Sequence, residues 1–184
     1  MTGATAPLVG VLALQGDFEA HGAVLRSLGA RVREVRTVAD LGGLQALVLP
    51  GGESTTMTLG IAREGLAEPL VELCGRVPVL GTCAGMIMLD RDHLGVLDMR
   101  CERNAFGRQV HSFEGDVTLA GFDEPFHGVF IRAPWVADHG AGIEVLGSVD
   151  GHPVAVASGS VLAVAFHPEL IGEDRLHRRL IGAA

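Results

Sequence analysis

Cys83 lies in a pattern that presents a nucleophile. Residues 78–88 read PVLGTCAGMIM, so a short apolar stretch runs into Gly-x-Cys-x-Gly and a second apolar stretch follows. Flanking glycines allow the strained strand-to-helix turn called a nucleophile elbow, which leaves the side chain between them exposed at the edge of a sheet. A thiol at a helix N-terminus is also stabilised as its thiolate by the helix dipole. The sequence therefore predicts a cysteine nucleophile at position 83.

A cysteine nucleophile needs a base, and His167 is the best placed of the eight histidines. It directly follows the apolar stretch 161–166, and open α/β sheets carry their sites at the carboxyl ends of strands. Pro168 favours an extended backbone at His167, and in an extended segment Glu169 points to the same side. A carboxylate beside an imidazole fixes its tautomer and stabilises the imidazolium. Cys83, His167 and Glu169 are thus predicted to form a catalytic triad.

An acyl-transfer site also needs donors for the oxyanion that develops on the substrate. The backbone N–H of Ala84, at the start of the elbow helix, is one candidate. Gly51 and Gly52 follow another predicted strand, and glycines let the backbone approach a substrate closely. Gly51-Gly52 alone is equally typical of an ordinary turn.

The remaining cysteines and histidines have simpler interpretations. Cys74 and Cys101 are expected to be inert core residues. A lone histidine is most often structural or exposed, and this is the expectation for His21, His93, His111, His127, His139, His152 and His177.

The first half of the chain alternates strand-like and helix-like segments. The predicted strands are 8–14, 31–35, 46–49 and 77–80. The predicted helices are 18–28, with Asp17 as N-cap and Gly29 as C-cap, and much of 56–74. Alternation at this spacing indicates parallel pairing.

The second half holds closely spaced strand candidates with glycine-containing breaks, at 110–119, 128–131, 143–149, 154–157 and 161–166, followed by a short helix over 174–181. This pattern indicates antiparallel additions and then a return to the main sheet. The predicted fold is therefore α/β, with a mixed, mostly parallel central sheet and flanking helices. No repeat, low-complexity tract or linker divides the chain, so a single domain over 1–184 is expected.

Composition limits the function classes. With 48% apolar and 20% charged residues the chain is typical of a globular protein, and a net charge of −8 argues against nucleic-acid binding. No apolar stretch has the length of a membrane helix, and residues 1–7 lack the basic residues of a secretory signal. Three cysteines without a CxxC spacing indicate neither a disulfide framework nor a zinc site. A cytoplasmic protein with no metal is the expectation.

Longer motifs now make a family recognisable. GTCAG at 81–85 with HPE at 167–169 resembles the class I, or triad, glutamine amidotransferases. Four further stretches resemble signatures of one branch of them, the glutaminase subunits of pyridoxal 5′-phosphate synthases: 14–16, 49–56, 102–109 and 130–134. The resemblance covers nearly the whole chain in order and implies their flavodoxin-like three-layer fold. Segment 89–95 looks shorter than is usual in the family.

The resemblance implies a reaction and a partner. Cys83 would attack the side-chain amide of glutamine, His167 would pass a proton to the departing ammonia, and water would release glutamate from a thioester. The glutamine-contacting positions of the family fall on Gly52, Glu53, Ser54, Arg103, Ile131 and Arg132. Ammonia would pass to a separate synthase subunit, whose docking typically activates the glutaminase. No cofactor is implied for this chain.

Two alternatives stay open. A stand-alone α/β cysteine hydrolase or peptidase would share the elbow and the triad. A non-enzymatic module that regulates a partner would not need an intact Cys-His-Glu set. For Arg103 and Arg132, the alternative to substrate binding is a structural salt bridge.

Overall fold

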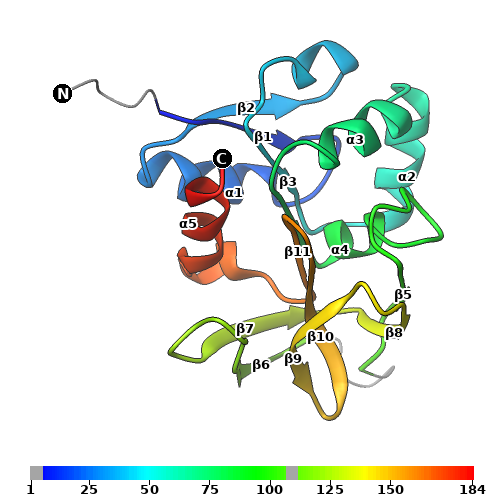
Figure 1. Cartoon of the computed structure of the whole chain (residues 1–184), viewed down its shortest axis with the longest axis vertical. Helices are drawn as coiled ribbons and strands as arrows, with labels where there is room; N and C mark the ends of the chain where they lie inside the picture. The colour runs from blue at the N-terminus through cyan, green and yellow to red at the C-terminus, as the bar shows by residue number, and fades with distance from the viewer. Residues whose placement is uncertain (1–5, 107–111) are drawn as a thin grey trace.

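A sheet of seven strands organises the chain in the computed structural model, which describes residues 6–106 and 112–184 (Figure 1). Its strands, in spatial order, are β2 (Arg31–Val35), β1 (Leu8–Leu12), β3 (Ala46–Leu49), β4 (Val79–Thr82), β11 (Val161–Val164), β10 (His152–Ser158) and β9 (Glu144–Val149). The first five pair in parallel, and β10 and β9 add on antiparallel. The predicted mixed, mostly parallel sheet is confirmed.

Helices cover both faces of the sheet. Figure 1 shows α1 (Phe18–Ser27) and α5 (Arg175–Gly182) on one face, and α2 (Ser54–Arg63), α3 (Ala67–Cys74) and α4 (Ala84–Met88) on the other. Every residue of β3, β4 and β11 is buried between these layers. This explains why those strands are continuous apolar runs rather than alternating patterns.

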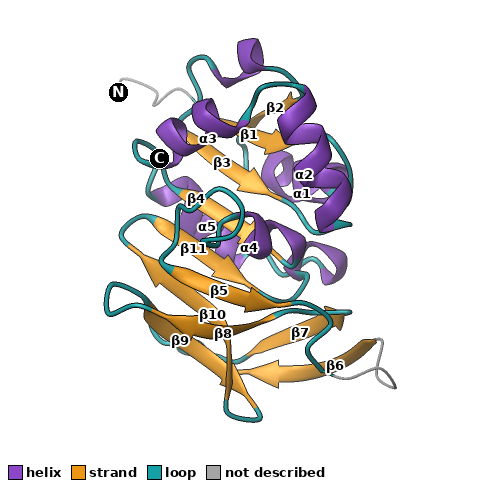
Figure 2. Ribbon diagram, turned by 90° about the vertical axis from the view of Figure 1, so that its right-hand side faces the viewer, coloured by secondary structure: helices purple, strands orange, loops and turns teal. Residues whose placement is uncertain are grey.

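Two small antiparallel sheets complete the fold at the β9 end (Figure 2). One pairs β5 (Met99–Glu102) with β8 (Trp135–His139), and the other pairs β6 (Ser112–Val117) with β7 (Phe126–Ile131). Short 3₁₀ helices lie at η1 (Val38–Leu41) and η2 (Pro168–Ile171). In the described part of the chain, no helix has both the length and the apolar character needed to cross a bilayer.

Apart from shifts of a few residues at element ends, the secondary-structure predictions differ from the structure in two places. The helix predicted over 56–74 is two helices, because Gly65 has a φ of +65° that interrupts the α-helix between Arg63 and Ala67. The sequence did not predict strands β5 and β8. Their sequences mix polar and apolar residues without a clear pattern, and the two strands form one short pair with each other. Of the strand predicted at 110–119, residues 110 and 111 lie outside the described residues, and the rest contains β6.

The sheet register determines where the site must lie. Strands β4 and β11 are parallel neighbours, with Thr82 opposite Val164. Cys83 and the segment after Val164 therefore leave the sheet at the same edge. The loops that follow β1 and β3 begin at this edge too, because all four strands run in the same direction.

Candidate active site

Cys83 sits in a strained backbone conformation, with φ 48° and ψ −107°. Few non-glycine residues adopt a positive φ, and such strain is typical of functional turns. The glycine at 85 is required sterically, because a Cβ there would lie 1.8 Å from the Leu49 carbonyl oxygen. The Cys83 N–H donates to the Val164 carbonyl at 2.8 Å, which joins the elbow to β11. The geometry is that of a nucleophile elbow, as the sequence predicts.

The elbow helix is shorter than the dipole argument requires. Helix α4 has five residues, from Ala84 to Met88. A helix of little more than one turn sums few peptide dipoles, so its contribution to a Cys83 thiolate is small. A charged partner for Cys83 must therefore come from another element, and His167 is the histidine that interacts with it.

His167 and Glu169 form a buried pair. The His167 Nδ1–H donates to Glu169 Oε1 at 2.7 Å, and both side chains are almost fully buried. The expected reason for this contact was wrong, because the chain does not stay extended: Glu169 lies in the 3₁₀ helix η2. His167 itself has φ −108° and ψ 87°, outside the helical region that a following proline disfavours, and the tight 3₁₀ turn then brings Glu169 back to the ring.

The pKa of His167 is raised. Burial alone would lower it, but hydrogen bonds and charges from Cys83 and Glu169 outweigh burial and raise the pKa to about 10. His167 is therefore an imidazolium at neutral pH when it faces the thiolate. An imidazolium in this place holds the proton that a leaving amine needs.

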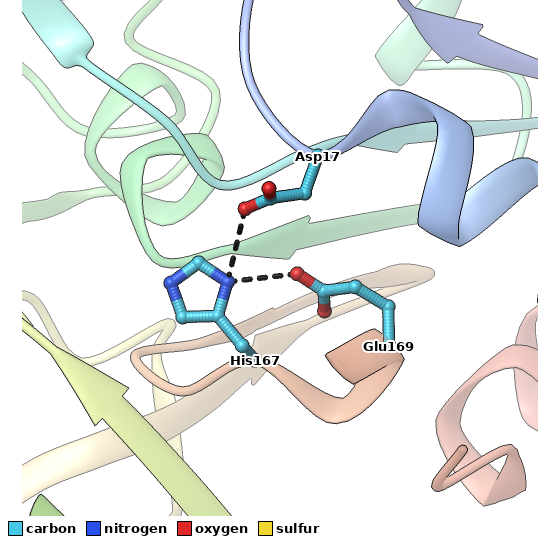
Figure 3. A group of neighbouring side chains, drawn as sticks. All are labelled: Asp17, His167 and Glu169. Carbon is cyan, nitrogen blue, oxygen red and sulfur yellow. Dashed lines mark hydrogen bonds and ion pairs between the residues drawn. The ribbon is translucent and has the colours of Figure 1, made fainter. Parts of the chain in front are cut away.

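Asp17 is a second carboxylate at the same ring nitrogen (Figure 3). Its Oδ2 lies 3.4 Å from His167 Nδ1, and its side chain is 39% exposed. The sequence predicts Asp17 as the N-cap of α1, and it occupies that position, but its side chain makes no capping hydrogen bond. Ligand atoms of Asp17, His167 and Glu169 lie within 4.8 Å of one another, the spacing of a metal site. Both carboxylates face the N–H at Nδ1 of His167, and this shared contact explains why the three side chains lie so close together.

Cys83 and His167 open into one pocket of about 330 Å³. All six predicted glutamine-contacting residues line it, as does Ala84, while Glu169 lies behind the His167 ring. The other lining residues are Gln15, Asp17, Ile87 and Asn104. Gly51 does not line the pocket but packs against the His167 ring, since a Cβ there would lie 2.3 Å from Cε1.

Glu53 is engaged by the protein itself. Its carboxylate caps α2, accepting from the Thr55 N–H at 3.0 Å and from the Thr56 N–H at 2.8 Å. Hydrogen bonds from these backbone groups lower its pKa to about 2. Arg103 approaches Glu53 Oε1 at 3.5 Å and Thr55 Oγ1 at 3.4 Å. These long, half-exposed contacts leave the guanidinium available to a ligand.

Gln15 is a site residue whose chemical role the sequence analysis missed. Its Oε1 accepts from the Glu53 N–H at 2.6 Å and so ties the loop after β1 to the loop after β3. Gly16, with a φ of +91°, permits the approach, since a Cβ there would lie 1.8 Å from the Gly51 carbonyl oxygen. The available signal was the position of Gln15 after an apolar strand, the same signal that identified His167.

The same loop contact orients the candidate oxyanion donors. The Gly51 carbonyl accepts from the Asp17 N–H at 3.1 Å. In a trans peptide the carbonyl and the following N–H point in opposite directions, so the Gly52 N–H is directed away from Asp17. The Ala84 N–H belongs to the first helical turn, whose amides have no acceptor within the helix.

The other cysteines differ from Cys83. Burial raises the pKa of Cys74 to about 12, and burial together with the charge of Asp90 raises the pKa of Cys101. Both thiols stay protonated at neutral pH, as expected for unreactive cysteines. Outside the pocket, His127 lies between Glu114 and Asp116 on the exposed β6–β7 pair, and Nδ1 of His93 lies 2.7 Å from Asp90 Oδ1.

Comparison with known proteins places these features in a family context. Residues 11–183 match the SNO glutamine amidotransferase family. The chain is 50% identical to the pyridoxal 5′-phosphate synthase subunit PdxT of Mycolicibacterium vanbaalenii, over 97% of this chain and 98% of that protein. It is 52% identical to the PdxT of Thermus thermophilus, over 96% of this chain and 97% of that one.

A solved structure agrees with the sequence comparisons. The structure described as a glutamine amidotransferase superimposes with a TM-score of 0.89 at 46% identity, covering 95% of this chain and 97% of that chain. The similarity therefore extends over nearly the whole of both chains.

Proposed function

Since this chain belongs to the SNO glutamine amidotransferase family, we propose that it is the glutaminase subunit of a pyridoxal 5′-phosphate synthase. It hydrolyses L-glutamine to L-glutamate and ammonia through a thioester on Cys83. The observation that carries this proposal is the shared pocket of Cys83 and His167, with Glu169 hydrogen-bonded behind the imidazole.

The first half-reaction breaks the amide bond. The Cys83 sulfur attacks the side-chain amide carbon of glutamine, and the N–H groups of Ala84 and of the Gly51–Gly52 segment stabilise the oxyanion. The imidazolium of His167 donates its proton to the nitrogen as the C–N bond breaks, so ammonia leaves and a glutamyl thioester remains. Glu169 keeps the imidazolium in the productive tautomer throughout.

The second half-reaction releases glutamate. His167, now neutral, accepts a proton from water while the water oxygen attacks the thioester carbon. The C–S bond breaks, the thiolate is restored, and the imidazolium is again beside it. No redox partner is required at any step.

Recognition of free glutamine needs groups for both charges of the amino acid. Arg103 and Arg132 supply guanidinium donors for the α-carboxylate, and Glu53 with nearby carbonyl oxygens supplies acceptors for the ammonium. Gly52, Ser54 and Ile131 present backbone or small polar groups beside them. The capped Glu53 stays ionised at physiological pH, which this role requires.

Ammonia is useful only where it is captured. We propose a cytoplasmic complex in which a separate synthase subunit accepts ammonia from this chain and activates it on docking. The relatives support this, since each is named as a subunit of a synthase. This chain would hold no pyridoxal phosphate itself.

The decisive experiment is co-purification with a synthase subunit from the same cell, followed by a glutaminase assay with and without it. Glutamate release should depend on the partner and should be lost in Cys83→Ala. Cys74→Ala is the matched control and should retain activity, because that thiol is buried away from the pocket. Retained turnover in Cys83→Ala would remove Cys83 from the mechanism. Efficient peptide hydrolysis by the isolated chain would favour the stand-alone hydrolase instead.

A further inference from the structure

Two fully buried histidines lie behind the triad. His21 comes from α1 and His177 from α5, and neither has any solvent exposure. Nδ1 of His21 and Nε2 of His177 are 2.8 Å apart, a hydrogen-bond distance. Burying two imidazoles together costs free energy unless their polar atoms are paired, so the arrangement calls for a role.

The chain of contacts ends on the triad. Nε2 of His21 lies 3.1 Å from Thr82 Oγ1 and 3.4 Å from Glu169 Oε2. Glu169 gives its other oxygen, Oε1, to His167. Its Oε2 is buried and has no hydrogen bond of good geometry among the described residues. His21 is thus the neighbour that can offset the buried negative charge on this oxygen.

Burial keeps both histidines neutral. The pKa of His21 is far below its ordinary value because of burial and of the neighbouring His177 and His167. Burial also lowers the pKa of His177 to about 4. A neutral imidazole has one donor nitrogen and one acceptor nitrogen, so each ring must choose a tautomer.

The two rings can be protonated in two patterns, which we call the first and the second chain. The hydrogen bond between the rings points in opposite directions in the two chains. In the first, His177 Nε2–H donates to His21 Nδ1, and His21 Nε2–H faces Glu169 Oε2. In the second, both rings carry the proton on Nδ1, and His21 Nε2 presents a lone pair toward the carboxylate. In the second chain the Thr82 hydroxyl can donate to His21 Nε2, but the lone pair also faces the buried negative charge of Glu169; the first chain places a proton there instead.

The first chain has a small cost that the structure records. It leaves Nδ1 of His177 as a lone pair without a donor, and this atom is indeed buried without a hydrogen bond. The second chain would instead turn an N–H at Nδ1 of His177 toward the backbone of Glu173, whose hydrogen bond raises the pKa of His177. At His177 the neutral backbone group therefore favours the second chain, whereas at His21 the buried charge of Glu169 favours the first, and hydrogen bonds to charged groups are about twice as strong as neutral ones.

We propose that His21 is a positioning residue for the triad, and that His177 sets its tautomer. His21 Nε2, which lies 3.1 Å from Thr82 Oγ1 and 3.4 Å from Glu169 Oε2, directs its proton toward the carboxylate and attracts it electrostatically, so that Oε1 stays aligned with His167 Nδ1. Helix α1, helix α5 and strand β4 thereby contribute one buried network that orients the catalytic imidazole. The inference rests on the proposed function only for its kinetic test.

The kinetic test compares two substitutions at position 21 in the complex with the synthase subunit. His21→Leu removes the donor and should lower kcat roughly tenfold to a hundredfold with KM for glutamine unchanged, the range typical of outer partners of metal-binding histidines. His21→Gln can place an amide N–H where Nε2 lies and should restore most of the activity. His139→Leu, on the exposed end of β8, is the matched control. Equal loss in His21→Leu and His21→Gln, with both folded, would overturn the proposal.

A second measurement needs no functional variant. ¹⁵N NMR of the histidine-labelled wild-type chain distinguishes a protonated ring nitrogen from an unprotonated one. The expected result is protonation at Nε2 in both His21 and His177, assigned by the signals lost in H21Q and H177Q. Protonation at Nδ1 in both rings would overturn the proposal. Because this result does not depend on turnover, it stands apart from any failure of the glutaminase assay.

Discussion

The two sides of the His167 ring differ in nearly every physical respect. On the pocket side, the charged residues come from loops and remain partly open to solvent: Glu53 is 43% and Arg103 is 49% exposed at the side chain. On the rear side, the side chains of Glu169 and His21 have no exposure at all. One side can exchange its partners for a ligand, and the other cannot.

The difference follows from what each side must do. Substrate must displace water and weak protein contacts, so long and half-exposed ion pairs are suitable there. The rear must hold one imidazole orientation through a whole catalytic cycle, and buried polar groups are rigid because unpaired alternatives are costly. Changes at the rear should therefore lower kcat, and changes at the pocket side should raise KM.

The largest expected effect separates the two carboxylates at His167 Nδ1 (Figure 3). Glu169→Gln should lower kcat by roughly 10²- to 10⁴-fold, since an amide in place of the carboxylate disfavours the productive tautomer, as in the Ser-His-Asp template. Asp17→Asn should cost about fivefold or less, because its contact is long and partly exposed. Steady-state kinetics of the complex measures both. Equal losses would mean that the partly exposed Asp17 contributes as much to the orientation of the ring as the buried Glu169.

The next effect belongs to the pocket side. Arg103→Gln should raise KM for glutamine by roughly tenfold to a hundredfold, the value of one charge-assisted hydrogen bond, while kcat changes little. Arg63→Gln, an exposed arginine outside the pocket, is the control and should leave KM unchanged. An unchanged KM in R103Q, or a fall in kcat instead, would assign Arg103 to structural support.

A pH effect on stability tests the pairing of His167 with Cys83 and Glu169. The folded-state pKa of His167 is raised from 6.5 to about 10, so the folded chain binds more protons than the unfolded chain between these values. Its contribution is complete below pH 6.5 and is lost as the pH rises through 10. The free energy of unfolding should therefore fall with pH over this window, and less so in H167Q. Identical slopes in urea titrations of the two chains would contradict the raised pKa.

The smallest effect concerns the N-cap of α2. Glu53→Ala should lower the free energy of unfolding by about 1 kcal/mol through loss of the cap. The lowered pKa places this contribution above pH 4.5, and it should disappear as the pH falls through about 2. Chemical denaturation measures it, with the exposed Glu72→Ala as control. A change no larger than that of the control would show that Thr55 and Thr56 find other partners.

Local patterns in the sequence predicted much of the fold. The strand at 46–49 has the predicted bounds, because a buried parallel strand is a short apolar run with clear ends. The strand at 31–35 also has the predicted bounds, although it is a partly exposed edge strand with three charged residues. The prediction of one helix over 56–74 is wrong at Gly65. The positive φ of this residue breaks the helix, whereas the apolar periodicity of the sequence continues across the break. Strands β5 and β8 escaped prediction because their pairing, and not their composition, makes them strands.

Sequence by itself determined which residues could do chemistry. Glycines around Cys83 permit an elbow, Pro168 biases His167, and both follow apolar strands; these are local facts, settled by sterics within a few residues. Only the tertiary structure determined which side chains lie behind the catalytic residues. It brought His21 from α1 and His177 from α5 to the rear of His167, across as many as 156 residues of chain, and it brought Asp17, the N-cap of α1, to the same ring from the pocket side. No spacing rule predicts such a meeting, because it depends on how two helices pack on one face of the sheet.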